Sequence, residues 1–358
     1  MSIVGGHRSP TAGLPTRWVA ADLGARPTPE AAFAGLISFG FMAQTTAYSI
    51  GVDLGGTNLR AAAVDRTGQI LGKQAGSIHL REGRESVVTD IVASIKALHE
   101  RFGAQECAGV GVAVPGFIRL KEGIVENSAN LPSLEGFPLR DEISQRLGTP
   151  VILENDANAA ALGEKWLGAG RDVDDLVLLT LGTGIGGGVI LNGRIMRGRD
   201  GMAGEFGHMT VIPNGNPCGC GNTGCLEKHA SATAISVMAR LLQLGELLTA
   251  EQVFRIATEG SGEDALKAKR IFELMGVALG IAIGNLVNVF NAPLYLLSGG
   301  PLPAWDLFAP TMIAEARKRS FTFRSTGTRI EKALLGNEAG LYGAAYLPFV
   351  EVGGTGNL

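Results

Sequence analysis

The sequence predicts an α/β protein made of two similar domains that face each other across a cleft. A strand, a glycine-rich turn and a returning strand occur in residues 48–64, and the same construction returns in residues 176–191. Glycine supplies 52 of the 358 residues, about twice its usual share, which indicates tight turns and close backbone approaches to a ligand. Because one two-glycine turn is also typical of an ordinary hairpin, the prediction depends on the repeat.

The composition limits the class of partner. With 46% hydrophobic and 18% charged residues, the chain can bury a large core. Its formal net charge is -3 and it has no long basic run, so we expect a small-molecule partner, with no nucleic acid and no membrane. Three of the four cysteines lie in residues 218–225 and Cys107 stands alone, which favours a cytoplasmic protein with thiolates on a metal over a disulfide framework.

The first 47 residues carry no helical or alternating pattern, so we expect a poorly ordered extension. The apolar run Ala31–Met42 could imitate a signal peptide, but Asp22 and Glu30 precede it and make export unfavourable. A start at Met42 would place the first strand a few residues in. We predict a smaller domain from residues 48–155 with 336–350, and a larger domain from residues 156–335.

The first turn has the composition of a phosphate site. Apolar residues alternate from Ile50 to Leu54, and the sequence Gly55-Gly56-Thr57-Asn58 then turns the chain into a second strand, Leu59–Val64. The backbone of Gly55, Gly56 and Thr57 can offer N–H groups to a phosphate, and the side chains of Thr57 and Asn58 can add donors. Asp53 ends the first strand and could hold Mg2+ directly or through water.

The second turn follows an apolar strand, Leu176–Leu181. We expect the turn over residues 182–188, with Gly182, Thr183 and Gly184 at the phosphates, and a returning strand over Val189–Leu191. A third turn, Ser298-Gly299-Gly300, follows a strand at Leu294–Leu297 and could place a base or ribose against bare backbone.

Between the two repeats, strands and helices alternate. Asp156 comes where a buried strand, Val151–Leu153, gives way to a helix, Ala157–Trp166. In that position it could be the helix N-cap or, beside a cleft, a general base. The other elements we predict here are a helix at Ser86–Phe102, a strand at Val110–Val114, a loop at Asn127–Leu131 and a helix at Leu139–Leu147.

The last third of the chain is mainly helical. Ala265–Asn285 is the longest apolar stretch, but charges, glycines and asparagines interrupt it, so we expect a core helix rather than a membrane span. Further helices are predicted at Ala230–Leu242, Ala250–Thr258 and Gly340–Leu347.

The segment Gly204–Glu227 predicts a structural zinc site. His208, Cys218, Cys220 and Cys225 offer one imidazole and three thiolates, a set that fills a tetrahedral zinc ion and leaves no position open for chemistry. Glu205 and Glu227 flank this set, and two fixed carboxylates suit a clamp for the hydroxyls of a polyol. The alternative is a zinc knot with two solvated glutamates.

Taken together, these motifs resemble the ROK family of sugar kinases, with the likeness closest to its ATP-dependent bacterial glucokinases. The resemblance spans residues 48–347 and implies the actin-like ATPase (RNase H-like) fold, ATP and Mg2+ as cofactors, and a homodimer. The implied reaction is phosphorylation of a hexose at its 6-hydroxyl, glucose to glucose 6-phosphate. The motifs that carry it are residues 53–60 (DLGGTNLR), 154–158 (ENDAN), 182–188 (GTGIGGG), 205–208 (EFGH) and 218–227 (CGCGNTGCLE).

The resemblance also implies a role for single residues. It makes Asp156 the catalytic base, and it makes Asn130, Asn155, Glu205, His208 and Glu227 sugar contacts. Two positions depart from the family pattern. Ser298 stands where many members have a further glycine, and Ala129 replaces the proline that often precedes Asn130.

Several alternatives stay open. The competing substrates are N-acetylglucosamine, N-acetylmannosamine, mannose and fructose, because a pocket that accepts or rejects them depends on loop shape. A sugar-sensing transcription regulator would need a helix-turn-helix module, and the leader is short, rich in proline and nearly without pattern. A sugar-binding protein without catalysis is disfavoured because Asp53, Asp156 and both turns are present.

Overall fold

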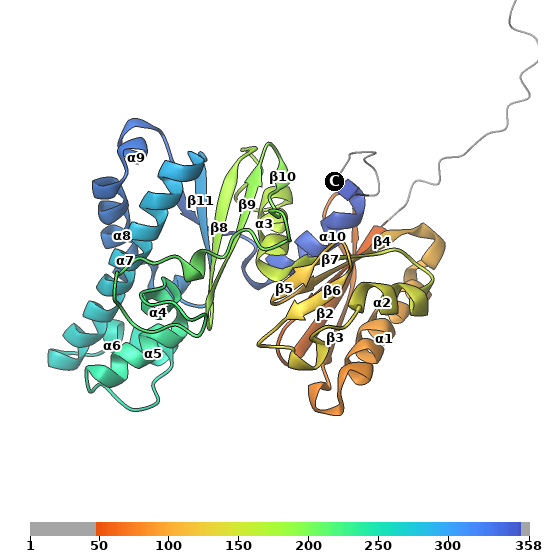
Figure 1. Cartoon of the computed structure of the whole chain (residues 1–358), viewed down its shortest axis with the longest axis horizontal. Coiled ribbons are helices and arrows are strands. Elements are labelled where there is room, and N and C mark those ends of the chain that lie inside the picture. Colours follow the sequence, from red (N-terminus) through yellow and green to blue (C-terminus); the bar gives the residue numbers. More distant parts are fainter. Residues whose placement is uncertain (1–47, 352–358) are drawn as a thin grey trace, which may run out of the picture. The chain divides into compact units, whose positions relative to one another are not determined.

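The computed structural model describes residues 48–351, and these form two mixed five-stranded sheets with helices around them (Figure 1). Residues 1–47, with the run Ala31–Met42, lie outside the described part. The first sheet has the order β3-β2-β1-β4-β7. Its strands are β1 (Tyr48–Leu54), β2 (Asn58–Asp65), β3 (Ile70–Ser77), β4 (Cys107–Val114) and β7 (Val151–Asn155).

The second sheet repeats the arrangement of the first. Its order is β10-β9-β8-β11-β12, so in both sheets the first three strands form an antiparallel meander and two later strands add in parallel. This repeat confirms the prediction of a duplicated α/β fold. The strands are β8 (Leu176–Leu181), β9 (Ile185–Leu191), β10 (Arg194–Ile195), β11 (Leu294–Gly299) and β12 (Arg329–Lys332).

The helices α3 (Asp156–Trp166) and α10 (Ala339–Glu351) pack against each other through very small residues. A Cβ placed on Gly343 would lie 1.6 Å from the Ala159 carbonyl oxygen, and one on Gly163 would lie 2.2 Å from that of Ala339. Only glycine permits this approach. Helix α10 also covers β1 and β4, so the end of the chain returns to the first sheet.

The remaining helices complete two cores, one around each sheet. The longest, α7 (Gly262–Phe290), is long and apolar enough to cross a membrane. However, 67% of its apolar 18-residue stretch is buried within the protein, and its apolar face belongs to the core of the second sheet. The expectation of a core helix is confirmed. The other helices of more than one turn are α1 (Arg84–Phe102), α2 (Leu139–Leu147), α5 (Ala232–Leu241), α6 (Ala250–Glu259), α8 (Trp305–Arg319) and α9 (Phe321–Ser325).

The glycine run after β8 differs from the prediction. Strand β9 begins already at Ile185, so Gly186, Gly187 and Gly188 lie in a strand and not in a turn. A Cβ on Gly187 would lie 2.2 Å from the Phe206 ring. One on Gly188 would lie 2.7 Å from Ala161 Cβ in α3. These glycines therefore let a helix and the segment after β10 approach both faces of the strand.

Candidate active site

Asp156 is the first residue of α3, directly after β7. The helix cap is Asn155, whose Oδ1 accepts the N–H groups of Ala157 at 2.9 Å and Asn158 at 3.2 Å. The N-cap interpretation of Asp156 is therefore wrong. Because the neighbouring asparagine already caps the helix, the Asp156 carboxylate is not needed there, and it accepts the Ala157 N–H at 2.9 Å.

The Asn155 side chain is largely engaged within the protein. Its Oδ1 serves the cap, and its Nδ2 donates to the Gly116 carbonyl oxygen at 3.1 Å. One N–H of the amide is left for a ligand, since each primary amide carries two. The predicted sugar contact of Asn155 can thus be made only through that N–H.

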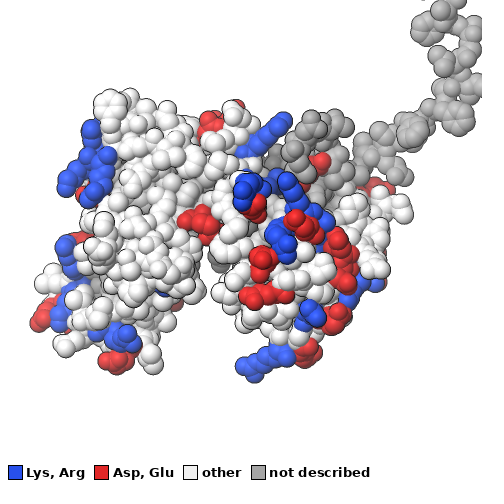
Figure 2. Space-filling model, in the orientation of Figure 1, with Lys and Arg blue, Asp and Glu red and all other residues white. Residues whose placement is uncertain are grey.

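The electrostatic surroundings of Asp156 identify its neighbours. Burial raises the pKa of its carboxyl from 3.8 to about 6, the Ala157 N–H opposes this, and the charges of Asp53 and Glu205 raise it further. A group near enough to feel both carboxylates lies between the end of β1 and the segment before the zinc ligands. Figure 2 shows the surface hollowed between the part built on the first sheet and the part built on the second, with acidic side chains beside the hollow.

The first turn is open to a ligand. Gly55, Thr57 and Asn58 are exposed, and the turn is closed by the Gly55 N–H donating to the Asn58 carbonyl oxygen at 2.8 Å. The sugar-loop residue Asn130 lies beside it, with its Cβ 3.9 Å from where a Gly56 Cβ would stand. The structure therefore brings a predicted sugar contact next to a predicted phosphate turn.

Asp53, at the end of β1, is ion-paired with Arg60 on the adjacent β2 strand. Arg60 also lies 3.7 Å from Glu338, just before α10. Burial raises the pKa of the Asp53 carboxyl while Arg60 opposes the rise. Sequence reasoning did not single out Arg60, although its place opposite Asp53 follows once the two strands are paired.

The second turn is held by more contacts. The Gly182 N–H closes it onto the Gly184 carbonyl oxygen at 2.9 Å. From α5, the Ala232 N–H donates to the Gly182 carbonyl oxygen at 2.9 Å, and the Thr233 hydroxyl donates to that of Thr183 at 2.7 Å. Gly182 and Thr183 remain exposed.

The third turn ends β11. Gly299 has φ +112, and a Cβ there would lie 1.9 Å from the Leu181 carbonyl oxygen, so this position requires glycine. Gly300 has open space around it and borders a small apolar pocket between the turn and α6. The pocket is lined by Ala250, Glu251, Phe254, Phe272, Gly300, Pro301, Pro303 and Ala304.

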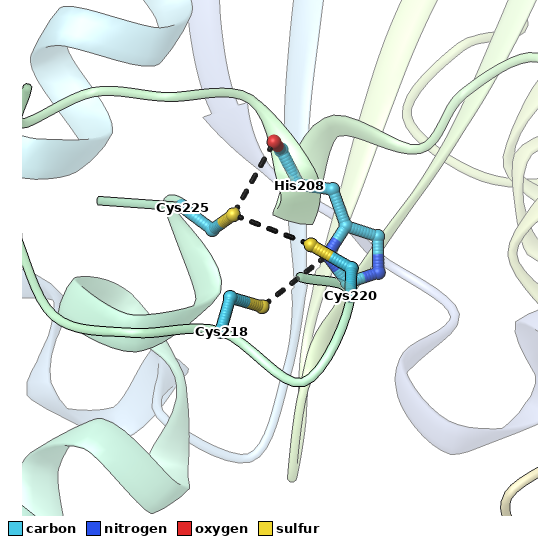
Figure 3. Close-up of side chains that lie close together, drawn as sticks. All are labelled: His208, Cys218, Cys220 and Cys225. Atoms are coloured by element: carbon cyan, nitrogen blue, oxygen red, sulfur yellow. Dashed lines mark hydrogen bonds between the residues drawn. The ribbon is translucent and has the colours of Figure 1, made fainter. Parts of the chain in front are cut away.

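The four predicted zinc ligands converge, with ligand atoms within 4.8 Å of one another (Figure 3). The Sγ atoms of Cys220 and Cys225 are 3.7 Å apart, and Cys218 Sγ is 3.6 Å from His208 Nδ1. A tetrahedral zinc with its usual bond lengths sets S···S at about 3.8 Å and S···N at about 3.6 Å. The donor set therefore fits zinc.

The predicted zinc ligands lie next to the predicted clamp. His208 Nδ1 faces the sulfurs, which leaves Nε2 for another partner. Burial raises the pKa of Glu205, His208 lowers it and Glu227 raises it, so these three side chains are neighbours. Glu227 begins the short helix α4 (Glu227–Ala230), two residues after Cys225.

Sequence reasoning missed one network beneath the site. Glu154 is fully buried, and Arg197 pairs with it at 2.7 Å. The same carboxylate accepts the Asn155 N–H and the Asn158 Nδ2, both at 3.0 Å. It thereby fixes the corner that presents Asp156. An acidic residue at the end of an apolar strand was the only signal for it.

Comparison with known proteins identifies the family. The ROK family model matches residues 49–349. A glucokinase of Thermotoga maritima is 38% identical over 319 residues, which cover 85% of this chain and 98% of the relative. A xylose repressor of Caldicellulosiruptor bescii is 31% identical over 310 residues, covering 82% of this chain and 76% of the relative.

Solved structures show the same fold. A ROK hexokinase from Thermus thermophilus has a TM-score of 0.77 at 33% identity, over 86% of this chain and 99% of its own. A ROK glucokinase from Streptomyces griseus, in complex with glucose and AMPPNP, has a TM-score of 0.69 at 33% identity, over 84% and 99%. The chain belongs to the ROK family, and the predicted fold class is confirmed.

Proposed function

We propose that this chain is an ATP-dependent hexose kinase that converts glucose to glucose 6-phosphate. The observation that carries the proposal is the position of Asp156, where burial first and then the charges of Asp53 and Glu205 raise the pKa of the carboxyl to about 6. It lies between a predicted phosphate site and a predicted sugar clamp. The glucokinase relatives and the glucose complex of a family member support the choice of glucose.

In the proposed reaction, the oxygen of the glucose 6-hydroxyl attacks the γ-phosphorus of ATP, and ADP leaves. The hydroxyl proton passes to the Asp156 carboxylate. A carboxyl with a pKa of about 6 is mostly ionised at neutral pH, yet it is a stronger base than an exposed aspartate. The protein otherwise positions the reactants and neutralises charge.

The sugar is held by groups from three parts of the chain. Glu205 and Glu227 accept hydrogen bonds from the sugar hydroxyls, and His208 uses the ring nitrogen that does not face the cysteine sulfurs. Asn130 and the free N–H of Asn155 complete the set. The phosphates lie against the exposed backbone of the first and second turns, and adenosine lies against Gly299 and Gly300.

Two metals belong to the proposal. Zinc, held by His208 and the three cysteines, fixes the clamp and takes no part in the reaction. Mg2+ accompanies ATP and neutralises phosphate charge, and Asp53 is the carboxylate that would hold it directly or through water.

We further propose that the protein is a homodimer in the reducing cytoplasm, where the cysteine thiols would stay reduced. The two-domain division given above is also part of the proposal.

The substrate is tested by a coupled assay of ATP turnover with glucose, mannose, fructose, N-acetylglucosamine and N-acetylmannosamine. We expect the largest kcat/KM for glucose. A larger value for one of the other sugars would replace glucose as the substrate, and no turnover with any of them would refute the kinase.

The second candidate is a sugar-sensing regulator, since a family relative is a repressor. It predicts sugar binding without turnover and specific DNA binding that glucose or xylose changes. A DNA-binding assay on the full chain at physiological salt distinguishes the two, because a kinase without a DNA-binding module should show no specific complex.

A further inference from the structure

We infer that Glu227 joins the hexose clamp to the second phosphate turn, so that hexose and nucleotide each strengthen the binding of the other. The inference rests on the proposed function, because it takes Glu227 as a sugar contact and residues 182–184 as a phosphate site. It goes further by assigning one carboxylate to both sites.

The contact between the two sites is direct. The Ile185 N–H, at the end of the second turn, donates to Glu227 Oε2 at 3.2 Å. A Cβ placed on Gly184 would lie 2.2 Å from the same oxygen, so the carboxylate lies against the turn with no room for a side chain between them. The contact joins residues that are 42 positions apart in the sequence.

The hydrogen bonds from α5 hold the start of the second turn, whereas the Glu227 carboxylate holds its end, at the Ile185 N–H. Helix α5 fixes the carbonyl oxygens of Gly182 and Thr183. Its cap, Ser231, donates its N–H to the Glu227 carbonyl oxygen at 3.3 Å. The backbone of Glu227 is thus tied to the helix that supports the turn, while its carboxylate holds the end of the turn.

The other carboxylate oxygen of Glu227, Oε1, has a weaker partner. Glu227 Oε1 is 3.5 Å from Lys228 Nζ, a partly exposed pair of a kind that contributes little. A hexose hydroxyl that donates to this oxygen would hold the side chain in one orientation. The Ile185 N–H would then be held in place before the nucleotide arrives, and linkage requires that bound nucleotide favour hexose to the same extent.

The chain offers a matched pair of variants. In Gly184→Ala, the new methyl meets Glu227 Oε2 and must displace the carboxylate. In Gly182→Ala, two residues away in the same turn, it meets nothing nearer than the Gly184 carbonyl oxygen at 3.9 Å. Both glycines have ordinary backbone angles, so neither substitution is strained by its φ.

The experiment is calorimetric titration of glucose, with and without saturating AMPPNP, into the zinc-loaded protein. We expect AMPPNP to tighten glucose binding by about five- to tenfold in the unmodified protein, at the lower end of usual coupling. Gly184→Ala should bind glucose about tenfold more weakly without nucleotide and should lose the coupling. Gly182→Ala, whose methyl does not reach Glu227, should bind glucose without nucleotide as tightly as the unmodified protein does.

Three outcomes would overturn the inference. The first is equal glucose affinity with and without AMPPNP in the unmodified protein. The second is normal glucose binding by Gly184→Ala, and the third is an equal loss of glucose affinity in Gly184→Ala and Gly182→Ala. The first of these needs no variant, so the test stands if Gly184→Ala does not fold. A protein that binds both ligands without coupling refutes only the inference, whereas one that binds neither refutes the proposed function.

Discussion

The two phosphate turns are built alike in sequence but supported differently in space. Among the described residues, the first turn is closed by its own backbone and held by one further backbone hydrogen bond, from the Ile78 N–H to the Thr57 carbonyl oxygen at 3.0 Å. The Asn130 side chain lies at ordinary packing distance from Gly56. The second turn is held by two hydrogen bonds from α5 and by the Glu227 carboxylate. The strand repeat therefore duplicates the backbone of the site without duplicating its supports.

Because their supports differ, the two turns depend on different parts of the molecule. The first turn depends on β1, β2 and the Asp53–Arg60 ion pair beside it. The second depends on the clamp, and through Glu227 on the zinc ligands next to it in the chain. Loss of the zinc knot should therefore weaken the binding of both hexose and nucleotide. A change beside the first turn should weaken the binding of nucleotide alone.

The largest effect is expected at Asp156, the proposed base, which would act on the hexose while both turns hold the phosphates of ATP. Asp156→Asn removes the proposed base without altering either turn, so kcat should fall by about 10²- to 10⁴-fold. Glucose and AMPPNP affinities should stay within about threefold, because their contacts remain. Steady-state kinetics and calorimetry measure the two quantities, with the exposed Asp264→Asn as control. Near-normal kcat would rule out Asp156 as the base.

Loss of zinc should affect the second turn through the clamp. Cys220→Ser removes an exposed ligand, and we expect zinc loss with a fall of about 10- to 100-fold in glucose affinity, the usual cost of disturbing the groups that orient a site. AMPPNP affinity should fall as well. Metal analysis and calorimetry test this against Cys107→Ser, which lies outside the knot. A zinc-free variant with normal glucose binding would contradict the account.

The first turn is tested through Arg60. Arg60→Met leaves Asp53 without its ion-pair partner, and since Arg60 lowers the pKa of that carboxyl, its loss should make Asp53 a poorer magnesium ligand. We expect KM for MgATP to rise by about three- to tenfold with glucose affinity unchanged.

Lys73→Met is the control for Arg60, since Lys73 also pairs with Glu338 but is not paired with Asp53. An equal loss of glucose affinity in Arg60→Met would show that the first turn, too, is coupled to the clamp. That result would remove the distinction between the turns.

The smallest effect concerns stability and pH. The folded-state pKa of Asp156 lies above its unfolded value, so ionisation of this group lowers the free energy of unfolding as pH rises from about 4 to 6. Without ligands, Asp156→Asn should be more stable than the parent by about 1–2 kcal/mol at pH 8, after allowance for partial exposure. At pH 4 the difference should be small. Urea unfolding at both values measures it, and a variant less stable at pH 8 would contradict the prediction.

The sequence carried enough to predict the groups that are close along the chain. The zinc ligands share one short segment, and both glycine turns join consecutive strands. The contacts between distant segments were not predictable, because nothing in the local pattern pairs Glu227 with Ile185 or Glu154 with Arg197.

One local pattern was misleading, and one long segment showed no pattern from which to predict its structure. The glycines at 186–188 indicated a turn, whereas they serve close packing on both faces of β9. The segment between Gly300 and Gly340 gave no prediction, although it forms α8, α9 and β12. Pro310 lies inside α8, where a proline normally argues against a helix. The roles of Asn130, Asn155 and His208 as sugar contacts came from the family resemblance alone, and they remain predictions.

The central claim is phosphoryl transfer from ATP to the glucose 6-hydroxyl at Asp156. Phosphorus NMR of the products, run with glucose and with 6-deoxyglucose, tests it most directly. The account predicts glucose 6-phosphate and ADP in equal amounts from glucose, and no sugar phosphate from 6-deoxyglucose although it binds. Phosphate on another hydroxyl, or a phosphorylated product from 6-deoxyglucose, would contradict it.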